Sequence, residues 1–290
     1  MQNNVLLGIG LMVVTTFMFS TMDGVSRYLA ENNNVFTLVT MRYWFIAIVM
    51  AITCLFVKDS FQKILYTKQP FTQFSRGLIL SLNNCLVVYT FTLLGLVETH
   101  AIIACYPLIV AGLSVPFLGE KFGWRRWTAI FIGFVGVIII LRPTTNVISE
   151  GAIYALVGAI MFAVYLILTR YVSRLDKAIT SFFWAGIGGS VTMTIISFFI
   201  WENILKEDFL WLLIMCVLSA SSHFMMVKTL QVAEASVIQP FSYLQLVFGS
   251  IIGVTIFSES IDLMIVVGVT IVIGAGLFTA WREYIKKHPI

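Results

Sequence analysis

The sequence predicts an all-α membrane protein with ten transmembrane helices, arranged as a 5+5 inverted repeat. Three observations support this fold class: an apolar composition, ten apolar runs with mostly short connections, and basic residues that gather in alternate connections. The chain is 59% hydrophobic and 11% charged, whereas soluble domains carry about 25% charged residues. This composition excludes a soluble globular protein, and the lipid bilayer is therefore an expected partner.

The ten apolar runs are long enough to cross a bilayer, whose hydrocarbon core of about 30 Å needs about 20 residues of helix. They cover residues 5–29, 36–57, 76–97, 101–119, 124–141, 150–171, 180–201, 209–229, 236–257 and 263–281. The first run is expected to be a retained span, because it lacks the basic start and the cleavage pattern of a signal peptide. The longest connection, 58–75, is expected to hold a short surface helix.

The distribution of lysine and arginine predicts the orientation. One set of alternate connections holds 14 of the 18 basic residues: Lys58, Lys63, Lys68, Arg76, Lys121, Arg125, Arg126, Arg170, Arg174, Lys177, Lys228, Arg282, Lys286 and Lys287. The other set holds Arg27, Arg142 and Lys206, and Arg42 falls within a span. Because basic loops remain in the cytoplasm, both termini are expected there, in a bacterial cytoplasmic (inner) membrane.

Two similar cassettes indicate an internal repeat, one over residues 98–141 and one over residues 234–280. In each, a glutamate opens the cassette, a proline follows early in the first apolar run, and a second glutamate ends that run. These residues are Glu98, Pro107 and Glu120 in the first copy and Glu234, Pro240 and Glu259 in the second. The turn between the two runs is basic in the first copy and acidic in the second, as expected for copies inserted in opposite directions.

A second similarity relates the halves at an offset of 143 residues, where Ser26-Arg27-Tyr28-Leu29 corresponds to Thr169-Arg170-Tyr171-Val172. Chance similarity between apolar segments is the alternative. An odd number of spans in each half reverses the second half relative to the first. Residues 1–145 and 146–290 are therefore predicted to be two five-helix repeats of opposite orientation.

Six segments, spread in order over nearly the whole chain, carry a family resemblance: Arg42 in MRYWF, Ser75-Arg76-Gly77, Ala101 through Pro107 to Leu118-Gly119-Glu120, Gly133-Phe134-Val135-Gly136, Pro240-Phe241-Ser242-Tyr243 and Phe257-Ser258-Glu259. With this ordered set, the chain resembles the EamA-type branch of the drug/metabolite transporter superfamily. The resemblance implies a secondary carrier with a central cavity and alternating access, similar to bacterial metabolite carriers that include uptake carriers for S-adenosylmethionine. One departure is Ser258, which stands where the first half has Gly119.

Asp23 and Arg42 are the first candidates for a functional site, because ionisable groups inside a span are costly and are retained for a reason. They lie almost equally far from the turn near residues 32–33, so both are expected about 10–15 Å below the outer surface. They are predicted to form a gate or an ion pair. A static pair that holds two helices together and a contact to the substrate both remain open.

Six further polar or aromatic residues are predicted to lie near the middle of the membrane and to bind substrate: Asn84, Tyr89, Tyr106, Tyr165, His223 and Tyr243. Inverted-repeat carriers bind their substrate at this depth, where the two halves meet. Hydrogen bonding between helices is the alternative role for these side chains. His223 is also the candidate for coupling to a proton, because histidine titrates near neutral pH.

The expected function is secondary transport, by alternating access, of a small polar or amphipathic metabolite: an amino acid, an S-adenosylmethionine-like or a nucleoside-like compound. The alternative is a membrane-embedded enzyme that acts on a lipid or isoprenoid substrate, and a third possibility is a structural subunit. No catalytic motif, metal-ligand spacing or Walker A sequence occurs. We therefore expect no enzyme activity, no catalytic residue, no metal, no cofactor and no nucleic-acid partner.

Overall fold

The computed structural model describes residues 5–56, 65–119, 124–141, 149–172, 175–232 and 239–287. Within these ranges the chain forms α-helices joined by short turns, so the all-α prediction is confirmed. The helices are α1 (Val5–Ala30), α2 (Val35–Phe56), α4 (Pro70–Ile103), α5 (Tyr106–Leu118), α6 (Trp124–Leu141), α7 (Glu150–Val172), α8 (Ala178–Ile200), α9 (Phe209–Val232), α11 (Leu244–Phe257) and α12 (Leu263–Lys287). Two short 3-10 helices, η1 (Lys206–Asp208) and η2 (Gln239–Tyr243), precede α9 and α11.

Six helices are long and apolar enough to cross a membrane: α1, α2, α4, α7, α8 and α9. The apolar parts of α5, α6, α11 and α12 are shorter, between 10 and 17 residues. The bounds agree well with the predicted runs, and α6 coincides with the predicted run 124–141. Most of the connection expected to hold a surface helix, residues 57–64, lies outside the described residues.

The predicted break between the third and fourth runs, at residues 98–100, is wrong. Helix α4 continues to Ile103, and the chain turns at Ala104 and Cys105. The helix instead kinks at Gly95, whose φ of 80° and ψ of −179° are accessible to glycine but not to residues with a side chain. Glu98 therefore lies inside α4, in the first turn after the kink, and not at the start of α5.

Helix α5 begins at Tyr106, and Gly119, with φ 71°, caps its C-terminal end. Pro107 lies in its first turn, where the missing N–H of proline removes no helical hydrogen bond. Helix α11 ends in the same way at Ser258, with φ 55°. The serine that departs from the first half therefore adopts the same left-handed backbone as Gly119. This conformation costs more for a residue with a Cβ.

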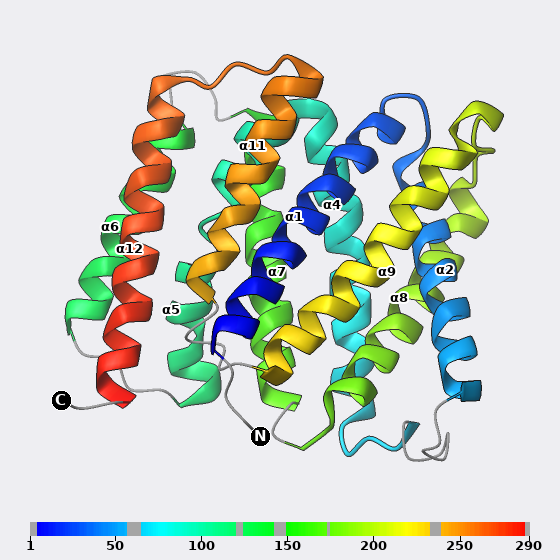
Figure 1. Ribbon diagram of the computed structural model, residues 1–290, viewed down its shortest axis with the longest axis horizontal. Helices are drawn as coiled ribbons and strands as arrows, with labels where there is room; N and C mark the ends of the chain where they lie inside the picture. The colour runs from blue at the N-terminus through cyan, green and yellow to red at the C-terminus, as the bar shows by residue number, and fades with distance from the viewer. Residues whose placement is uncertain are drawn as a thin grey trace.

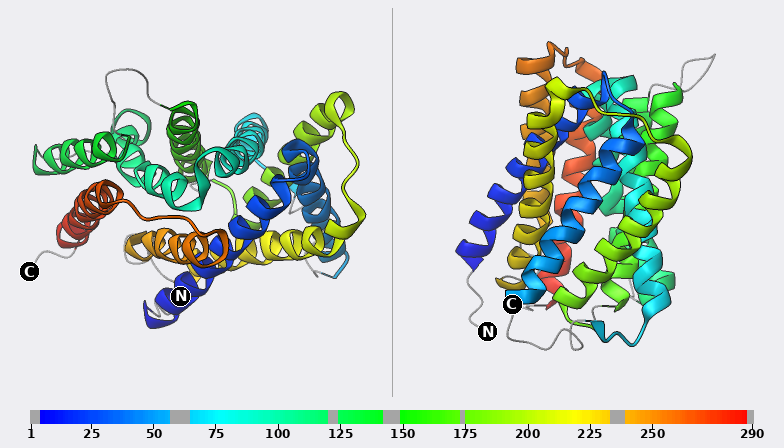
Figure 2. Two further views of the ribbon diagram at one scale, coloured as in Figure 1. Left: turned by 90° about the horizontal axis from the view of Figure 1, so that it is seen from above. Right: turned by 90° about the vertical axis from the view of Figure 1, so that its right-hand side faces the viewer.

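The helices form two rows when the bundle is seen from above (Figure 2). One row contains α6, α5, α7 and α4, the other contains α12, α11, α1 and α9, and α2 and α8 close one end. Within and between the rows, α6 packs on α12, α4 on α7, and α1 on both α9 and α11. Helix α4 also contacts α1 and α11, so it connects the two rows in the middle of the molecule.

Helix α1 begins and α12 ends at the same end of the bundle, which is called the terminal end below (Figure 1). At the opposite end, the turn between α1 and α2 contacts the connection between α8 and α9. There Asn33 donates from Nδ2 to Asp208 Oδ2 at 2.6 Å, and Asn34 donates from Nδ2 to Glu202 Oε1 at 3.0 Å.

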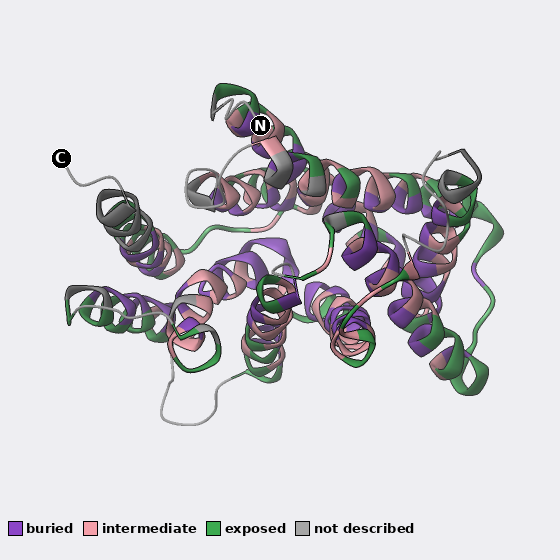
Figure 3. Cartoon of the chain, turned by 90° about the horizontal axis from the view of Figure 1, so that it is seen from below, coloured by how far each residue is buried: buried purple, intermediate pink, exposed green. Residues whose placement is uncertain are grey.

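Buried residues lie on the sides of the helices that face other helices, and exposed residues lie on the outward sides (Figure 3). The outward sides carry large apolar side chains such as Phe117, Phe131, Phe198 and Trp281. A soluble monomer does not expose so much apolar surface. On the inward side of α7, Ala155 and Ala159 are completely buried in one cluster with residues of α4, α5 and α12.

Candidate functional site

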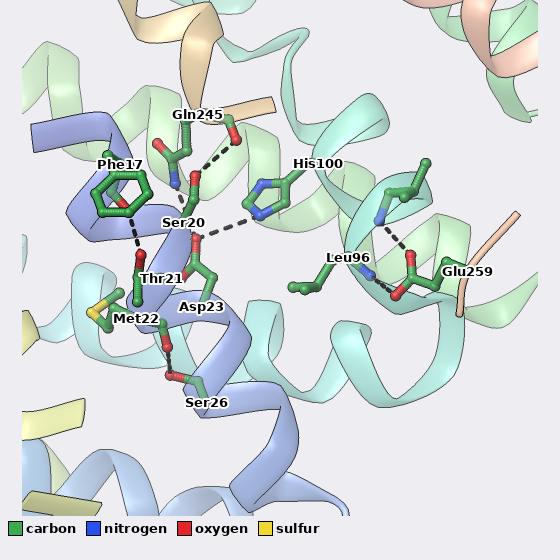
Figure 4. A network of polar contacts seen from close by, with 11 residues as sticks. Phe17, Ser20, Thr21, Met22, Asp23, Ser26, Leu96, His100, Gln245 and Glu259 are labelled. Atoms are coloured by element: carbon green, nitrogen blue, oxygen red, sulfur yellow. Dashed lines mark hydrogen bonds and ion pairs between the residues drawn. The ribbon is translucent and has the colours of Figure 1, made fainter. Parts of the chain in front are cut away.

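Asp23 is a buried acidic residue near the end of α1, and its carboxylate contacts two other helices. Nε2 of Gln245, in α11, donates to Asp23 Oδ2 at 3.1 Å, and Nε2 of His100, in α4, lies 3.5 Å from the same oxygen. Ser20, one turn earlier in α1, donates from its hydroxyl to the carbonyl of Gln245 at 2.9 Å. Figure 4 shows these four side chains together. They connect α1 to both α4 and α11.

Arg42 lies within α2 and is only 3% exposed. No hydrogen bond or ion pair reaches its guanidinium from the described part of the chain, and its Nε is fully covered without a partner. Its charge acts at a distance on side chains of other helices: Asp23 in α1, Cys85 in α4, and Cys216 and His223 in α9. Burying a charge without a partner costs several kcal/mol, so an unpaired buried arginine calls for an explanation.

The direct ion pair predicted between Asp23 and Arg42 is not formed. The partners of Asp23 are Gln245 and His100, and Arg42 affects it only through its electrostatic field. Both residues are buried. Sequence position gives the depth of a side chain but not the helix that it faces, which depends on how α1 and α2 rotate in the bundle. Energetic coupling between the two residues stays a prediction.

Tyr43 connects two of the predicted substrate-binding residues. Asn84 donates from Nδ2 to the Tyr43 hydroxyl at 2.9 Å, and Tyr165 and Arg42 both lie near this hydroxyl. The ring of Tyr165 in turn lies under the guanidinium of Arg76, whose Cζ is 5.3 Å from the ring centroid. Asn84 and Tyr165 are thus linked to the Arg42 region through one tyrosine, which the sequence analysis did not select.

His223 lies in α9 on the same face as Cys216 and Ser219, at intervals of three and four residues. Its Nδ1 is 2.8 Å from the carbonyl oxygen of Ser219, and its ring packs edge-on against Phe19 with centroids 5.1 Å apart. The Ser219 hydroxyl oxygen is covered and has no hydrogen-bond partner among the described residues. This face of α9 is therefore polar, and the electrostatic influence of Arg42 on two of its residues shows that α2 approaches it.

Tyr106 and Tyr243 form a second group, closer to α7 and α12. The ring of Tyr106 packs edge-on against Phe162 at 4.9 Å between centroids, and its hydroxyl is hydrogen-bonded to Ser242. Tyr243 is buried in the cluster formed by α4, α5, α7 and α12. Its hydroxyl lies against Gly276, where any Cβ would collide with it, and it has no hydrogen-bond partner in the described ranges.

The structure places Tyr89 away from both groups. Its side chain is 43% exposed on α4, and its ring lies 5.9 Å from that of Tyr154 on α7. This position gives no support to a role in substrate binding. The helical period explains the difference, because Tyr89 lies on the outward face of α4 whereas Val88 and Phe91 are buried.

A polar network at the terminal end holds the start of α4 against the connection between α7 and α8. Asp176 accepts hydrogen bonds from the Thr67 hydroxyl, from Gln73 Nε2 at 2.8 Å and from the Lys68 amide at 3.3 Å. Partial burial by itself raises the pKa of Asp176. The hydrogen bonds and the positive charge of Lys68 outweigh this effect, and the pKa lies below its ordinary value.

At the opposite end, a carboxylate accepts hydrogen bonds from the backbone amides that follow the kink in α4. Glu259 accepts hydrogen bonds of 2.8 Å from the amides of Leu96 and Val97, one on each carboxylate oxygen (Figure 4). It also forms an ion pair with Arg27. These two amides begin the helical segment after Gly95, so they lack partners within the helix. A carboxylate at this position also interacts favourably with the helix dipole.

Cysteines and metal ligands do not form a further site in the described residues. Cys85, Cys105 and Cys216 are buried free thiols, as their apolar surroundings predict. No group of three or more histidine, cysteine, aspartate or glutamate side chains converges there as a metal site would require.

A family model described as "EamA-like transporter family" matches residues 6–142 and 149–281, which together make up nearly the whole chain. The chain belongs to the EamA-like transporter family. The resemblance to this branch is therefore confirmed, and the chain is a multi-pass membrane protein of a transporter family rather than an enzyme.

Several curated relatives of this EamA-like protein have names that refer to transport. An S-adenosylmethionine uptake transporter of Rickettsia felis is 28% identical over 281 residues, which cover 96% of this chain and 94% of the relative. A protein of the same name from Rickettsia bellii is also 28% identical, over 280 residues with the same coverage. A riboflavin transporter of Brucella anthropi is 23% identical over 205 residues, covering 66% of this chain and 69% of the relative.

One solved crystal structure covers 100% of this chain and 100% of its own, with a TM-score of 0.65 and 11% sequence identity. At this identity the likeness shows a shared fold and nothing about the substrate. Sequence analysis did not select His100, Gln245, Tyr43 or Glu259. The sequence gives one signal for each: His100, Gln245 and Tyr43 are polar side chains in or beside apolar runs, and Glu259 ends an apolar run.

Proposed function

We propose that this chain is a secondary transporter that moves a small polar or amphipathic metabolite across the bacterial cytoplasmic membrane by alternating access. The observation that carries the proposal is the group of polar side chains between α1, α2, α4 and α9, in which Asp23 and Arg42 are buried and Asn84 and His223 are half-buried. Charged groups within membrane spans are costly and mark the path of a substrate or an ion. Membership of a transporter family supports this role over an embedded enzyme.

The proposed substrate is an amino acid, an S-adenosylmethionine-like or a nucleoside-like compound. Each has polar groups that hydrogen-bond to Asn, Tyr and His side chains, and an uncharged imidazole can both donate and accept. The S-adenosylmethionine transporters of Rickettsia support this class, since their similarity extends over almost the whole chain. The aromatic group of Tyr106, Phe162 and Tyr165 supplies apolar surface for the less polar part of such a molecule.

We also propose that the ten helices form two five-helix repeats of opposite orientation, divided near residue 145. The family model matches once on each side of this point. In such a symmetry α1 corresponds to α7, α4 to α9 and α5 to α11. The contact of α1 with α9 then corresponds to that of α7 with α4, and the contact of α1 with α11 corresponds to that of α7 with α5. Among the other large contacts, α2 with α8 and α6 with α12 join each helix to its own counterpart, and the contact of α4 with α8 corresponds to a smaller one of α9 with α2.

The proposed orientation has both termini in the cytoplasm, so the terminal end of the bundle faces inward. The sequence supports it, since 14 of the 18 basic residues fall in the predicted connections that this orientation assigns to the inner side. In this orientation, Asn33, Asp208 and Glu259 lie at the outer end.

Alternating access is supported by a difference between the two ends. At the outer end, α4 packs on α1 and α11, and Glu259 joins them. The counterpart of α4 is α9, which makes no comparable contact with α7 and α5 in the described residues. Glu120, the counterpart of Glu259, lies outside the described residues. We propose that this structure is closed toward the outside and that a symmetric rearrangement closes the inner end.

The proposal is tested by counterflow of radiolabelled S-adenosylmethionine, methionine, adenosine and riboflavin in proteoliposomes that contain the full chain. Concentrative exchange of at least one of the first three is expected, with none in empty liposomes. A Tyr89→Phe variant is the matched control, because its side chain lies outside the polar group, and it should behave like wild type. A folded protein that exchanges none of the first three compounds would refute the proposed substrate class. Coupling to a proton through His223 stays a separate prediction.

A further inference from the structure

We propose that Asp23 and Arg42 together bind the α-amino acid head group of the substrate, with its carboxylate on Arg42 and its ammonium group on Asp23. This inference rests on the transport function proposed above and narrows its substrate class. It replaces the expected gate or ion pair with a site for a ligand that carries both charges on one carbon atom.

Arg42 is buried without a protein partner in the described part of the chain. Its side chain is 97% buried, yet no protein atom among the described residues forms a hydrogen bond or ion pair with the guanidinium. Arg76, the comparable buried arginine, has partners on two sides: its Nε donates to Thr169 at 3.0 Å, and its Nη1 donates to Gln73. A guanidinium presents five donors in a planar fork that matches a carboxylate. Arg42 therefore has the charge and the unused N–H donors to bind a carboxylate.

The state of Asp23 is the second argument. Both of its contacts, from Gln245 and His100, involve the oxygen Oδ2. Oδ1 has no hydrogen bond from the described residues, so one carboxylate oxygen is free to accept from a ligand. Gln245 and Ser20 hold the carboxylate toward α11, and the His100 ring is in turn held against Gly249, where a Cβ would lie 2.5 Å from its Cδ2.

The separation of the two charges is the third argument. Gln245 of α11 and His100 of α4 contact the Asp23 carboxylate, and no ion pair joins it to Arg42 in the described part of the chain, so the two residues do not neutralise each other directly. They remain within electrostatic range of one another. An amino acid head group placed between them would satisfy both, because its carboxylate and ammonium groups are held apart by a single carbon atom.

The arrangement also discriminates among the compounds that the relatives are named for. S-Adenosylmethionine carries an ammonium and a carboxylate group on its α-carbon, and riboflavin carries neither. A site of opposite charges favours the first compound and leaves both charges without partners when the second is bound, which lowers its affinity. We therefore expect amino acid derivatives to bind and flavins to be rejected.

Competition experiments with purified full-length protein in proteoliposomes test the head-group contact. S-Adenosylmethionine should compete with labelled S-adenosylmethionine about 10- to 100-fold better than its decarboxylated analogue, because a hydrogen bond to a charged group is lost. In Arg42→Gln, the affinity for S-adenosylmethionine should fall to that of the analogue, while the affinity for the analogue stays near its wild-type value. Equal competition by both compounds in wild type would overturn the inference while leaving the transport proposal intact, and so would preferred exchange of riboflavin.

A measurement without substrate tests the same inference independently. If Arg42 lacks a protein partner, Arg42→Met removes an uncompensated buried charge, so the ligand-free variant should unfold at or above the wild-type temperature. Arg76→Met is the matched control: it breaks the contacts to Thr169 and Gln73 and should lower the unfolding temperature. An Arg42→Met protein that unfolds as early as Arg76→Met would show that Arg42 is a structural residue and would overturn the inference, even if no substrate were exchanged by wild type.

Discussion

Glu259→Gln tests how the outer end of the bundle is held closed. The Glu259 carboxylate accepts one backbone hydrogen bond on each oxygen, from Leu96 and Val97 at 2.8 Å, and pairs with Arg27. Glutamine has nearly the same shape but only one acceptor oxygen, and its amide nitrogen can only donate. One amide at the start of the α4 segment after Gly95 would therefore lose its partner, and Arg27 would lose its counter-charge.

The magnitude follows from these contacts. Losing one hydrogen bond to a charged group costs about 1.5–3 kcal/mol. The ion pair adds less than a fully buried pair would, because the side chains of Arg27 and Glu259 are 15% and 12% exposed. A total loss of about 2–4 kcal/mol is expected, and 1.4 kcal/mol corresponds to a factor of ten. The closed arrangement should thus become at least about 30-fold less favourable relative to the open one.

Two assays measure the loss: thermal unfolding in detergent, and the rate at which an impermeant thiol reagent modifies a cysteine placed at Leu96. Glu259→Gln should unfold earlier and react faster. Glu202→Gln is the matched control, since Glu202 is an exposed acid at the same end that accepts one hydrogen bond, from Asn34 at 3.0 Å. If both variants unfold and react alike, the contact between Glu259 and the kinked helix does not hold this end closed.

Three further predictions follow from the site and the orientation. Asp176→Asn should destabilise the protein at pH 7 by less than about 1 kcal/mol, since its carboxylate is largely solvated. Because the pKa of Asp176 is lowered in the folded state, the stability that wild type has over Asp176→Asn is complete above about pH 4 and is lost as the pH falls further. Unfolding of both proteins at pH 7 and pH 3 checks this, and an equal difference in stability at the two pH values contradicts it. His223→Ala should weaken S-adenosylmethionine binding about tenfold with little change in unfolding temperature. The Tyr243 hydroxyl has no partner among the described residues, so Tyr243→Phe should leave stability unchanged or slightly raised. If both variants lose stability and keep wild-type affinity, both side chains are structural. Asn33→Cys and Asn203→Cys should react with an impermeant reagent from outside sealed cells, and protection of both would reverse the orientation.

The candidate site was only partly predictable from the sequence. Asp23, Arg42, Asn84 and His223 were found because polar groups inside apolar runs are costly, and this reasoning needs no contact information. Tyr89 was selected on the same grounds, but it lies on an outward face. Its depth was inferred from position along α4, whereas its direction depends on helix rotation, which a nearly uniformly apolar helix does not reveal.

The fold class of this protein and the approximate bounds of its helices follow from the sequence alone. In a bilayer every backbone polar group must be satisfied within its own segment, so an apolar run of sufficient length becomes a helix whatever its neighbours are. Contacts between helices are decided only by the tertiary structure. The kink at Gly95 is satisfied by a carboxylate that lies 164 residues further along the chain, and Asp23 meets His100 and Gln245 rather than Arg42. Lipid is as apolar as most helix surfaces, so helix faces are selected by small residues and polar contacts that no local pattern records.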